Sequence, residues 1–270
     1  MMLQVRVIPC LLLKNGGLVK TISFANPRYV GDPINVMRIF NEKEVDELIL
    51  LDVEASRHGQ NPNYVQIQEI VSEAFMPIAY GGGVTGVEQA QRLVGLGVEK
   101  VVVNTAALQS FDLVRDMAKR LGSSSTVVAV DVKKDWLGRY RVFGSATGKE
   151  INRDPVEHAQ QVVAAGAGEI LINDVARDGT GVGYDLELVR RVAEGVDVPV
   201  IICGGAGTLE HFREAVCAGA SAVAAGSMFV YVGKHRAVMI NYPKRDTLER
   251  IFEDDGVSGL FPLCDGHHRE

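Results

Sequence analysis

Two glycine pairs, each followed by a hydroxyl residue, are the part of this sequence best suited to bind an anion. Gly82-Gly83 precedes Thr105 in the first half of the chain, and Gly204-Gly205 precedes Ser227 in the second. A glycine turn leaves backbone N–H groups free and lets an anion approach closely. A helix that starts there adds the positive end of its dipole. The pattern predicts two phosphate sites, although tight turns alone would account for either glycine pair.

The two copies belong to an internal repeat with a constant offset of 122 residues. A repeat of this kind determines the architecture of a protein. One offset holding over the whole pattern predicts two similar halves, each with its own copy of the site. Further pairs at this offset are Glu47 and Glu169, Asp52 and Asp174, Glu88 and Glu210, Gly97 and Gly219, and Asn104 and Gly226.

Short apolar runs alternate with amphipathic stretches and must position these residues. The runs lack strict alternation, which is typical of parallel strands covered on both faces. Eight such units in 270 residues predict a TIM (βα)8 barrel of two (βα)4 half-barrels over residues 1–252, with an open doubly wound sheet as the alternative. The predicted strands are Val5–Leu11, Glu47–Asp52, Ile78–Tyr80, Lys100–Val103, Thr126–Val130, Glu169–Asn173, Val200–Cys203 and Ala222–Ala225, and the clearest helices are Val87–Leu96, Asp185–Glu194 and Leu209–Ala218.

Two segments interrupt the alternation. Asp135–Gly148 contains turn residues and alternates in polarity, which predicts a hairpin or a mobile loop over the barrel mouth. Residues 253–270 are polar and non-periodic, which predicts a loose C-terminal extension. Its Cys264, His267 and His268 are expected to be solvated and not to hold a metal.

Composition limits the partners. The net charge of −6 argues against a nucleic-acid surface. No apolar run reaches the roughly 18 residues of a membrane span, and we expect no signal peptide. Four cysteines without a CxxC pair predict reduced, buried thiols in a cytoplasmic protein, and no motif calls for a cofactor or a metal.

Several motifs together resemble the cyclase (synthase) subunit of imidazole glycerol phosphate synthase, over residues 4 to about 232. That family is a (βα)8 barrel paired with a glutaminase subunit as a heterodimer. Ammonia from glutamine passes through the barrel and cyclises a bisphosphorylated ribulosyl substrate at its mouth. The motifs are Arg6–Cys10, Gly31–Pro33, Asp46–Leu48, Gly81–Gly83, Asn104–Ala107, Arg177–Thr180, Gly183–Asp185 and Gly204–Gly207.

The resemblance implies roles for individual residues. One catalytic aspartate corresponds to Asp131. Phosphate contacts are implied for Gly83, Asn104 and Thr105 on one side, and for Asp178, Gly179, Gly204, Gly205, Gly226 and Ser227 on the other. Lys20 and Asp52 are implied as a substrate contact and a polar group at the mouth. Arg6, Glu47, Lys100 and Glu169 correspond to the charged ring through which ammonia enters; a salt-bridged plug that only stabilises the barrel bottom explains them equally well.

One catalytic aspartate of the family pattern is missing. Aligned at an offset of 119, the stretch Arg6–Lys14 brings Lys14 against Lys133 and Leu12 against Asp131. The family has an aspartate where this chain has Leu12. Cyclisation needs one group to accept a proton and another to donate one. Ala176 and Cys203 also depart from the family pattern.

A paralogous group resembles the chain more closely in Cys10–Gly17 and His235–Pro243. In that group a cyclase-like barrel and a glutaminase supply ammonia to an enzyme that amidates a sugar in surface-polysaccharide (lipopolysaccharide) biosynthesis. The first hypothesis is such an amidotransferase subunit. The alternatives are a genuine cyclase of histidine biosynthesis, and a scaffold that binds a phosphorylated ligand and activates a glutaminase without chemistry of its own.

Overall fold

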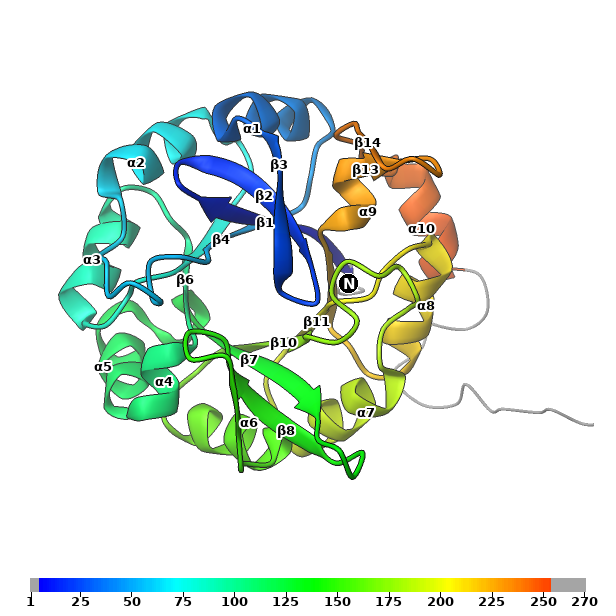
Figure 1. The fold of residues 1–270 in the computed structure, drawn as a ribbon. Helices are drawn as coiled ribbons and strands as arrows, with labels where there is room; N and C mark the ends of the chain where they lie inside the picture. Colours follow the sequence, from blue (N-terminus) through cyan, green and yellow to red (C-terminus); the bar gives the residue numbers. More distant parts are fainter. Residues whose placement is uncertain (1–4, 254–270) are drawn as a thin grey trace, which may run out of the picture.

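Short runs of Val, Ile and Leu form the inner strands of the structure, a computed structural model that describes residues 5–253. Eight parallel strands form a closed ring, because β1 pairs with β12 and β7 pairs with β10 (Figure 1). The predicted (βα)8 barrel is confirmed. The strands in ring order are β1 (Arg6–Lys14), β4 (Leu48–Asp52), β5 (Ile78–Gly81), β6 (Lys100–Val103), β7 (Thr126–Lys134), β10 (Glu169–Asp174), β11 (Val200–Cys203) and β12 (Ala222–Ala225).

Helices surround this ring (Figure 1). Their starts follow capping rules: the Asp32 carboxylate accepts from the Asn35 amide at 3.0 Å, and Pro33 occupies the first turn. The helices are α1 (Pro33–Glu42), α2 (Tyr64–Glu73), α3 (Val87–Gly95), α4 (Thr105–Gln109), α5 (Asp112–Leu121), α6 (Pro155–Ala164), α7 (Leu186–Gly195), α8 (Leu209–Cys217), α9 (Ser227–Val230) and α10 (Arg245–Glu253), with a 3₁₀ turn at Ser123–Ser125.

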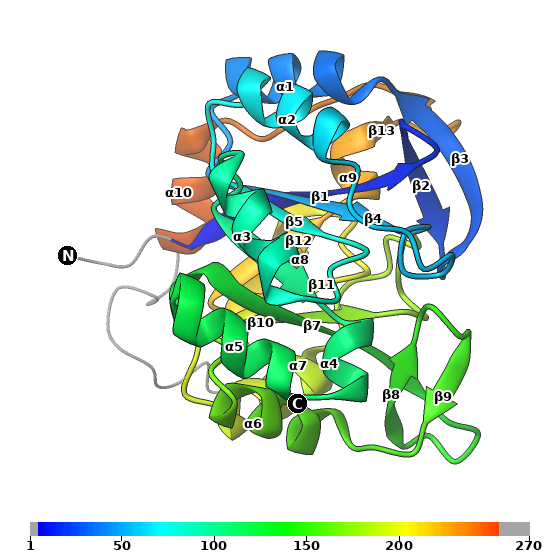
Figure 2. The ribbon, with the colours of Figure 1, turned by 90° about the vertical axis from the view of Figure 1, so that its left-hand side faces the viewer.

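Each half-barrel begins with a strand that continues beyond the barrel into an antiparallel arm. One arm adds β2 (Gly17–Ile22) and β3 (Ala25–Gly31) to β1, and the other adds β8 (Tyr140–Gly144) and β9 (Lys149–Ile151) to β7. Both arms project from the same end of the barrel, at the carboxyl ends of its strands (Figure 2).

The second arm confirms the hairpin alternative for Asp135–Gly148. The first arm corrects the prediction that the first strand ends at Leu11, because β1 runs on to Lys14. A two-residue turn, Asn15-Gly16, then starts β2, with φ of 50° and 81°. Positive φ at both positions is what a tight hairpin turn requires, and Asn-Gly is its usual sequence.

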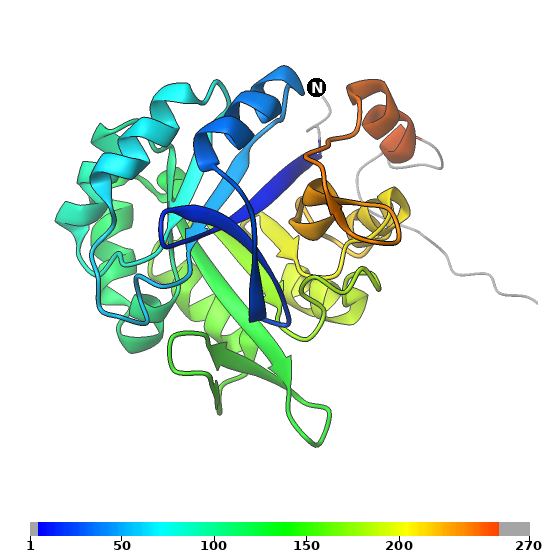
Figure 3. The same cartoon turned by 45° about the horizontal axis from the view of Figure 1, so that its top comes forward.

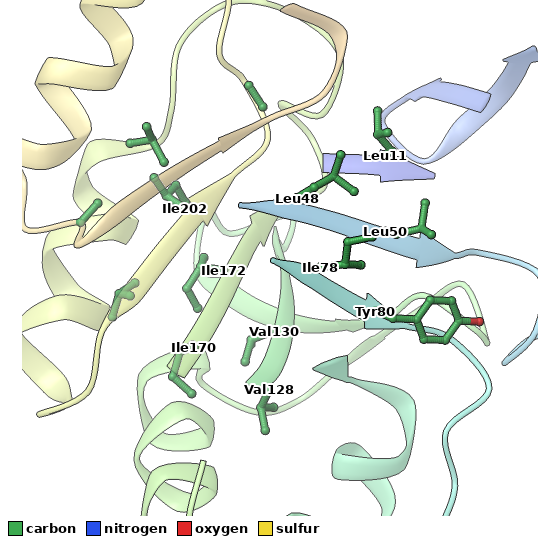
Figure 4. Close-up of a cluster of buried hydrophobic side chains, with 14 of the residues drawn as sticks. Leu11, Leu48, Leu50, Ile78, Tyr80, Val128, Val130, Ile170, Ile172 and Ile202 are labelled. Carbon is green, nitrogen blue, oxygen red and sulfur yellow. The ribbon is translucent and has the colours of Figure 1, made fainter. Parts of the chain in front are cut away.

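The core has two parts separated by the barrel wall. Outward-facing side chains of the strands pack against the helices, and Figure 4 labels ten of them, including Leu50, Tyr80 and Ile172. The barrel interior holds a second cluster of smaller side chains, among them Cys10 and Ala129. Because side chains alternate along a strand, every second residue contributes to this interior.

The chain ends with a small hairpin and a helix. Strands β13 (Tyr231–Val232) and β14 (Ala237–Val238) follow α9 at the barrel rim (Figure 3), and α10 follows them. The predicted extension, with Cys264, His267 and His268, lies outside the described residues except for Glu253. Cys217 lies exposed on α8 and not buried as expected, whereas Cys10 and Cys203 are buried. Within residues 5–253, no helix combines the length and the apolar character needed to cross a membrane.

Candidate functional site

The first of the two predicted phosphate sites, here named the first cradle, is a cavity of about 230 Å³ at the carboxyl ends of β5 and β6. Gly82 and Gly83 form its floor after β5, and Asn104 and Thr105 border it where α4 begins. The Gly83 amide donates to the Ser56 hydroxyl at 3.2 Å. The described residues that line the first cradle offer hydroxyls, amides and backbone groups, and none of these residues is charged.

The second predicted phosphate site, here named the second cradle, lies after β11 and β12 and has nearly the same backbone conformation as the first. Gly226 has φ −111° and ψ −70°, close to the −131° and −77° of Asn104, and Ser227 starts α9 as Thr105 starts α4. Gly204 and Gly82 both have positive φ. A Cβ on Gly204 would lie 2.6 Å from the Asp174 carbonyl oxygen, and a Cβ on Gly82 would lie 2.5 Å from the Asp52 carbonyl oxygen. Only glycine fits these turns.

Asp52 and Asp174 hold equivalent loops in place. Asp52 Oδ1 accepts from the Glu54 and Ala55 amides at 3.0 Å each, and Asp174 Oδ1 accepts from the Ala176 and Arg177 amides at 2.9 and 3.3 Å. The structure therefore gives Asp52 a turn-forming role beside the first cradle. Its expected contact with a ligand stays a prediction.

Asp131 lies inside the barrel at the mouth, where β7 leaves the ring. Asn104 Nδ2 donates to its Oδ2 at 2.8 Å, and the Ser145 hydroxyl donates to the same oxygen. Burial raises the pKa of Asp131 to about 6, against the lowering effect of these hydrogen bonds. A carboxyl with such a pKa can both give and take a proton near neutral pH.

Leu12 occupies the corresponding place on the opposite strand. Along β1 the inward positions alternate through Ile8 and Cys10, which belong to the interior cluster, and the same alternation directs Leu12 inward. Leu12 is buried, with 8% of its surface exposed. The mouth thus carries a carboxyl on β7 and an aliphatic side chain on β1.

Lys20 reaches the second cradle from β2. Its Nζ donates to the Cys10 carbonyl at 3.0 Å, and only 4% of the residue is exposed. A Cβ on Gly226 would lie 1.8 Å from this Nζ, so the ammonium occupies the space that a side chain at position 226 would fill. Among residues 5–253, no carboxylate forms an ion pair with Lys20.

The tip of the first arm rests on the loop after β10. The Thr21 hydroxyl donates to Asp178 Oδ2 at 2.7 Å, and the Ser23 amide donates to the Asp178 carbonyl at 2.9 Å. Gly179 lies so close that a Cβ would be 2.3 Å from the Thr21 oxygen. The structure therefore places Asp178 and Gly179 beside the second cradle and ties them to the arm, and their expected contact with a phosphate stays a prediction.

Sequence reasoning missed three polar residues at the mouth. Asn173 neighbours Asp131 in the sheet, and its Oδ1 is a buried acceptor for which residues 5–253 supply no donor. The alternation Glu169, Leu171, Asn173 could have identified it as inward-facing. Ser145 and Arg236 reach the mouth from the second arm and the β13–β14 hairpin, and no local pattern signals either contact.

Four charged side chains cross-link the opposite end of the barrel. Arg6 forms ion pairs with Glu47 and Glu169, and Lys100 Nζ lies 2.9 Å from both of these carboxylates. Both glutamates are almost fully buried. The predicted ring is therefore assembled and internally neutral, which by itself fits either a plug or a closed gate.

The comparisons with known proteins agree with this geometry. The family model described as "Histidine biosynthesis protein" matches residues 6–236. A Pseudomonas aeruginosa protein, provisionally named imidazole glycerol phosphate synthase subunit hisF2, is 53% identical over 92% of this chain and 99% of its own. A Vibrio vulnificus relative, provisionally named subunit hisF3, is 44% identical over 93% and 98%. The subunit HisF of Exiguobacterium sibiricum is 41% identical over 84% and 91%.

These matches cover nearly all of the residues that build the barrel and its mouth. The chain therefore belongs to the histidine biosynthesis protein family, as a relative of the HisF subunits of imidazole glycerol phosphate synthase.

Proposed function

We propose that the chain is a HisF-type synthase subunit that receives ammonia from a glutaminase partner and binds a bisphosphorylated, ribose-type ligand at the barrel mouth. It would serve sugar amidation in surface-polysaccharide biosynthesis, in the cytoplasm. Two relatives that share more than 40% of its residues carry the provisional names hisF2 and hisF3, which suit a paralogue beside a histidine-pathway enzyme.

Two backbone cradles on opposite sides of the mouth support a ligand with two phosphate groups. Each combines a glycine turn with a hydroxyl residue at the start of a short helix. Such groups bind phosphate in many TIM barrels. The ligand would span the mouth, with its reacting atoms above Asp131.

The barrel interior supports passage of a small neutral molecule. Between the charged ring and the mouth, the interior is lined by small and apolar side chains such as Ala79, Ala129 and Ala224. Ammonia is small and uncharged, so crossing this lining costs it far less than it would cost an ammonium ion. The ion pairs of the ring close the bottom, and passage would require one of them to open, which is a role for the glutaminase.

The observation that carries the proposal is that Asp131 on β7 faces an aliphatic residue, Leu12, and no second carboxyl on the opposite strand β1. Asp131 has the burial and pKa of an acid–base group, but Leu12 stands where a second carboxyl would have to act. A missing general acid or base typically lowers the rate by about 10²- to 10⁴-fold. We therefore expect weak cyclase activity and an ammonia-accepting reaction that takes place on another enzyme.

The test is an ammonium-dependent cyclase assay with the ribulosyl bisphosphate substrate, comparing the unmodified chain with Leu12→Asp. The variant should gain at least about 10²-fold in kcat/KM. Leu12→Asn is the matched control, because it adds polarity without an ionisable group and should gain little. Equal activity of the unmodified chain and the aspartate variant would instead support a genuine histidine-pathway cyclase.

A second assay tests the partner. The chain is mixed with the glutaminase and with a sugar-amidating enzyme, and glutamine-dependent formation of the amidated sugar is measured. Product that requires all three proteins supports the proposal. A glutaminase stimulated by the chain, with no amidated product from any acceptor, would support the scaffold function instead.

A further inference from the structure

The β13–β14 hairpin places one arginine at the rim of the second cradle. Its turn is closed by the Arg236 amide, which donates to the Gly233 carbonyl at 3.0 Å. Arg236 itself has φ of 49°, in the left-handed region that non-glycine residues seldom adopt. This φ fixes the course of the turn and so the direction in which the Arg236 side chain leaves it.

The guanidinium of Arg236 is held at three points. Nη1 donates to the Gly179 carbonyl at 3.1 Å, and Nη2 donates to the Ser227 hydroxyl at 3.4 Å. The guanidinium carbon lies 4.6 Å from the centre of the Tyr231 ring, a favourable cation–π distance. Both residues that receive its hydrogen bonds belong to the second cradle.

No described residue neutralises the positive charge of Arg236. Within residues 5–253, no carboxylate approaches its nitrogens to ion-pair distance. Arg177, by contrast, is committed to its own loop through Asp174 and the carbonyls of Gly183 and Tyr184. Arg236 therefore has its charge and part of its donor fork available for an anion.

We infer that Arg236 is a phosphate-binding residue and makes the second cradle the stronger anion site of the two. This inference rests on the proposed function, since it concerns the same ligand. A phosphate that accepts from the Ser227 hydroxyl would also lie within reach of Nη2, because the two atoms are neighbours. Arginine is suited to this contact because its planar fork can donate two hydrogen bonds to one phosphate.

The charge around the two cradles supports the assignment. The first cradle has no charged residue in its lining. The second has two cations, Arg236 on its outer side and the buried Lys20 ammonium against Gly226, beside the Asp178 carboxylate, which already accepts from the Thr21 hydroxyl. No residue of the β13–β14 hairpin is among the phosphate contacts that the family resemblance implies. Arg236 would thus bind one phosphate group of the ligand more tightly at the second cradle than the other is bound at the first, and so set the orientation of the ligand.

The test is a titration with inorganic phosphate, followed by NMR through the backbone amides of Ser227 and Thr105, which report the two cradles separately. In the unmodified chain, the Ser227 amide should respond at lower phosphate concentration. Arg236→Gln should raise the Kd at Ser227 by about tenfold or more, since hydrogen bonds to charged groups are the stronger ones. The Kd at Thr105 should change less than about twofold.

Two further variants separate this contact from general effects. Lys234→Gln removes one charge from the same exposed turn and should leave both Kd values within about twofold, because long-range effects of exposed charges are screened. Arg236→Lys keeps the charge without the planar fork and should give an intermediate Kd at Ser227.

The inference is overturned if Arg236→Gln leaves the Kd at Ser227 unchanged, or if Lys234→Gln weakens it equally. Binding at both cradles with equal affinity in the unmodified chain would overturn it too, while leaving the proposed function intact. Phosphate that shifts neither amide in the unmodified chain would overturn the proposed bisphosphate ligand, and the assignment of Arg236 with it.

Discussion

The two half-barrels share a backbone and differ in charge. Asn104 and Gly226 have nearly the same φ and ψ and precede the same kind of short helix. The Asn104 side chain binds Asp131, whereas the missing side chain of Gly226 leaves room for the Lys20 ammonium. One backbone design therefore gives a neutral, amide-rich site in one half and a cationic site in the other. Side chains can thus divide a symmetric mouth into unequal ends without altering its turns.

At the bottom of the barrel, too, the two halves contribute different charges. Glu47 and Glu169 are equivalent by the repeat, but both cations come from the first half, and the counterpart of Lys100 is Ala222. A ring built this way depends on a few unshared charges, so single substitutions should have very unequal effects in the two halves.

The largest loss of stability is expected for Lys100→Met. The ammonium lies between Glu47 and Glu169, whose carboxylates are almost fully buried. Its removal would leave Arg6 to neutralise both carboxylates, and breaking a buried ion pair typically costs about 3–5 kcal/mol. Urea denaturation measures the change. Lys119→Met, at an exposed position of α5, should change the free energy of unfolding by less than about 0.5 kcal/mol; equal effects of the two substitutions would show that the ring does not hold the barrel bottom together.

A matched pair of glycine substitutions tests whether the two halves have equivalent backbones. Gly82→Ala and Gly204→Ala would each bring a Cβ within 2.6 Å of a backbone oxygen, at a positive φ. We expect each to lower the free energy of unfolding by about 2–4 kcal/mol, from steric overlap and backbone strain. The two losses should agree within about 1 kcal/mol, given that context changes such values.

Gly95→Ala is the control for this pair. No heavy atom of the described residues lies within 4 Å of the added Cβ, and Gly95 ends α3 without a positive φ. Alanine favours helix over glycine by up to about 1 kcal/mol, so this variant should be neutral or slightly stabilised. A large loss in only one of Gly82→Ala and Gly204→Ala would mean that the halves share a sequence pattern but not its structural consequence.

Much of the likeness between the two halves could be predicted from the sequence, because the same short motifs recur at one constant offset. It relates Asp52 to Asp174 and Gly82 to Gly204, and the structure gives each pair the same contacts. The strands were predictable for the same reason, since each is a short apolar run. The position of Asp131 directly after the predicted strand Thr126–Val130, together with the family resemblance, likewise placed it at the mouth.

The remaining features depend on contacts between distant segments. The first arm reaches Asp178 through Thr21, 157 residues away in sequence, and no local pattern encodes that docking. Arg236 reaches the second cradle only because its hairpin folds back over α9. The Asn15-Gly16 turn, however, was a readable hairpin signal, and it would have predicted β2.

The smallest expected change in stability concerns Asp131, which lies opposite Leu12 at the mouth. Unlike the other substitutions, replacing Asp131 should stabilise the protein. The folded-state pKa of Asp131 is about 6, above its ordinary value of 3.8. Between these values the folded state binds more protons than the unfolded state, so stability falls as pH rises through this window. Above pH 6 the buried carboxylate is ionised and destabilises the fold.

Asp131→Asn should therefore stabilise the protein by about 1–3 kcal/mol above pH 6, and the gain should vanish below about pH 4. Unfolding curves recorded from pH 4 to pH 8 measure this difference. Asp32→Asn, at the exposed N-cap of α1, is the control and should change little, because Asn caps helices as well as Asp. A variant no more stable than the unmodified chain at pH 8 would mean that Ser145 and Asn104 fully compensate the buried charge, so that Asp131 differs from Leu12 in chemistry but not in its contribution to stability.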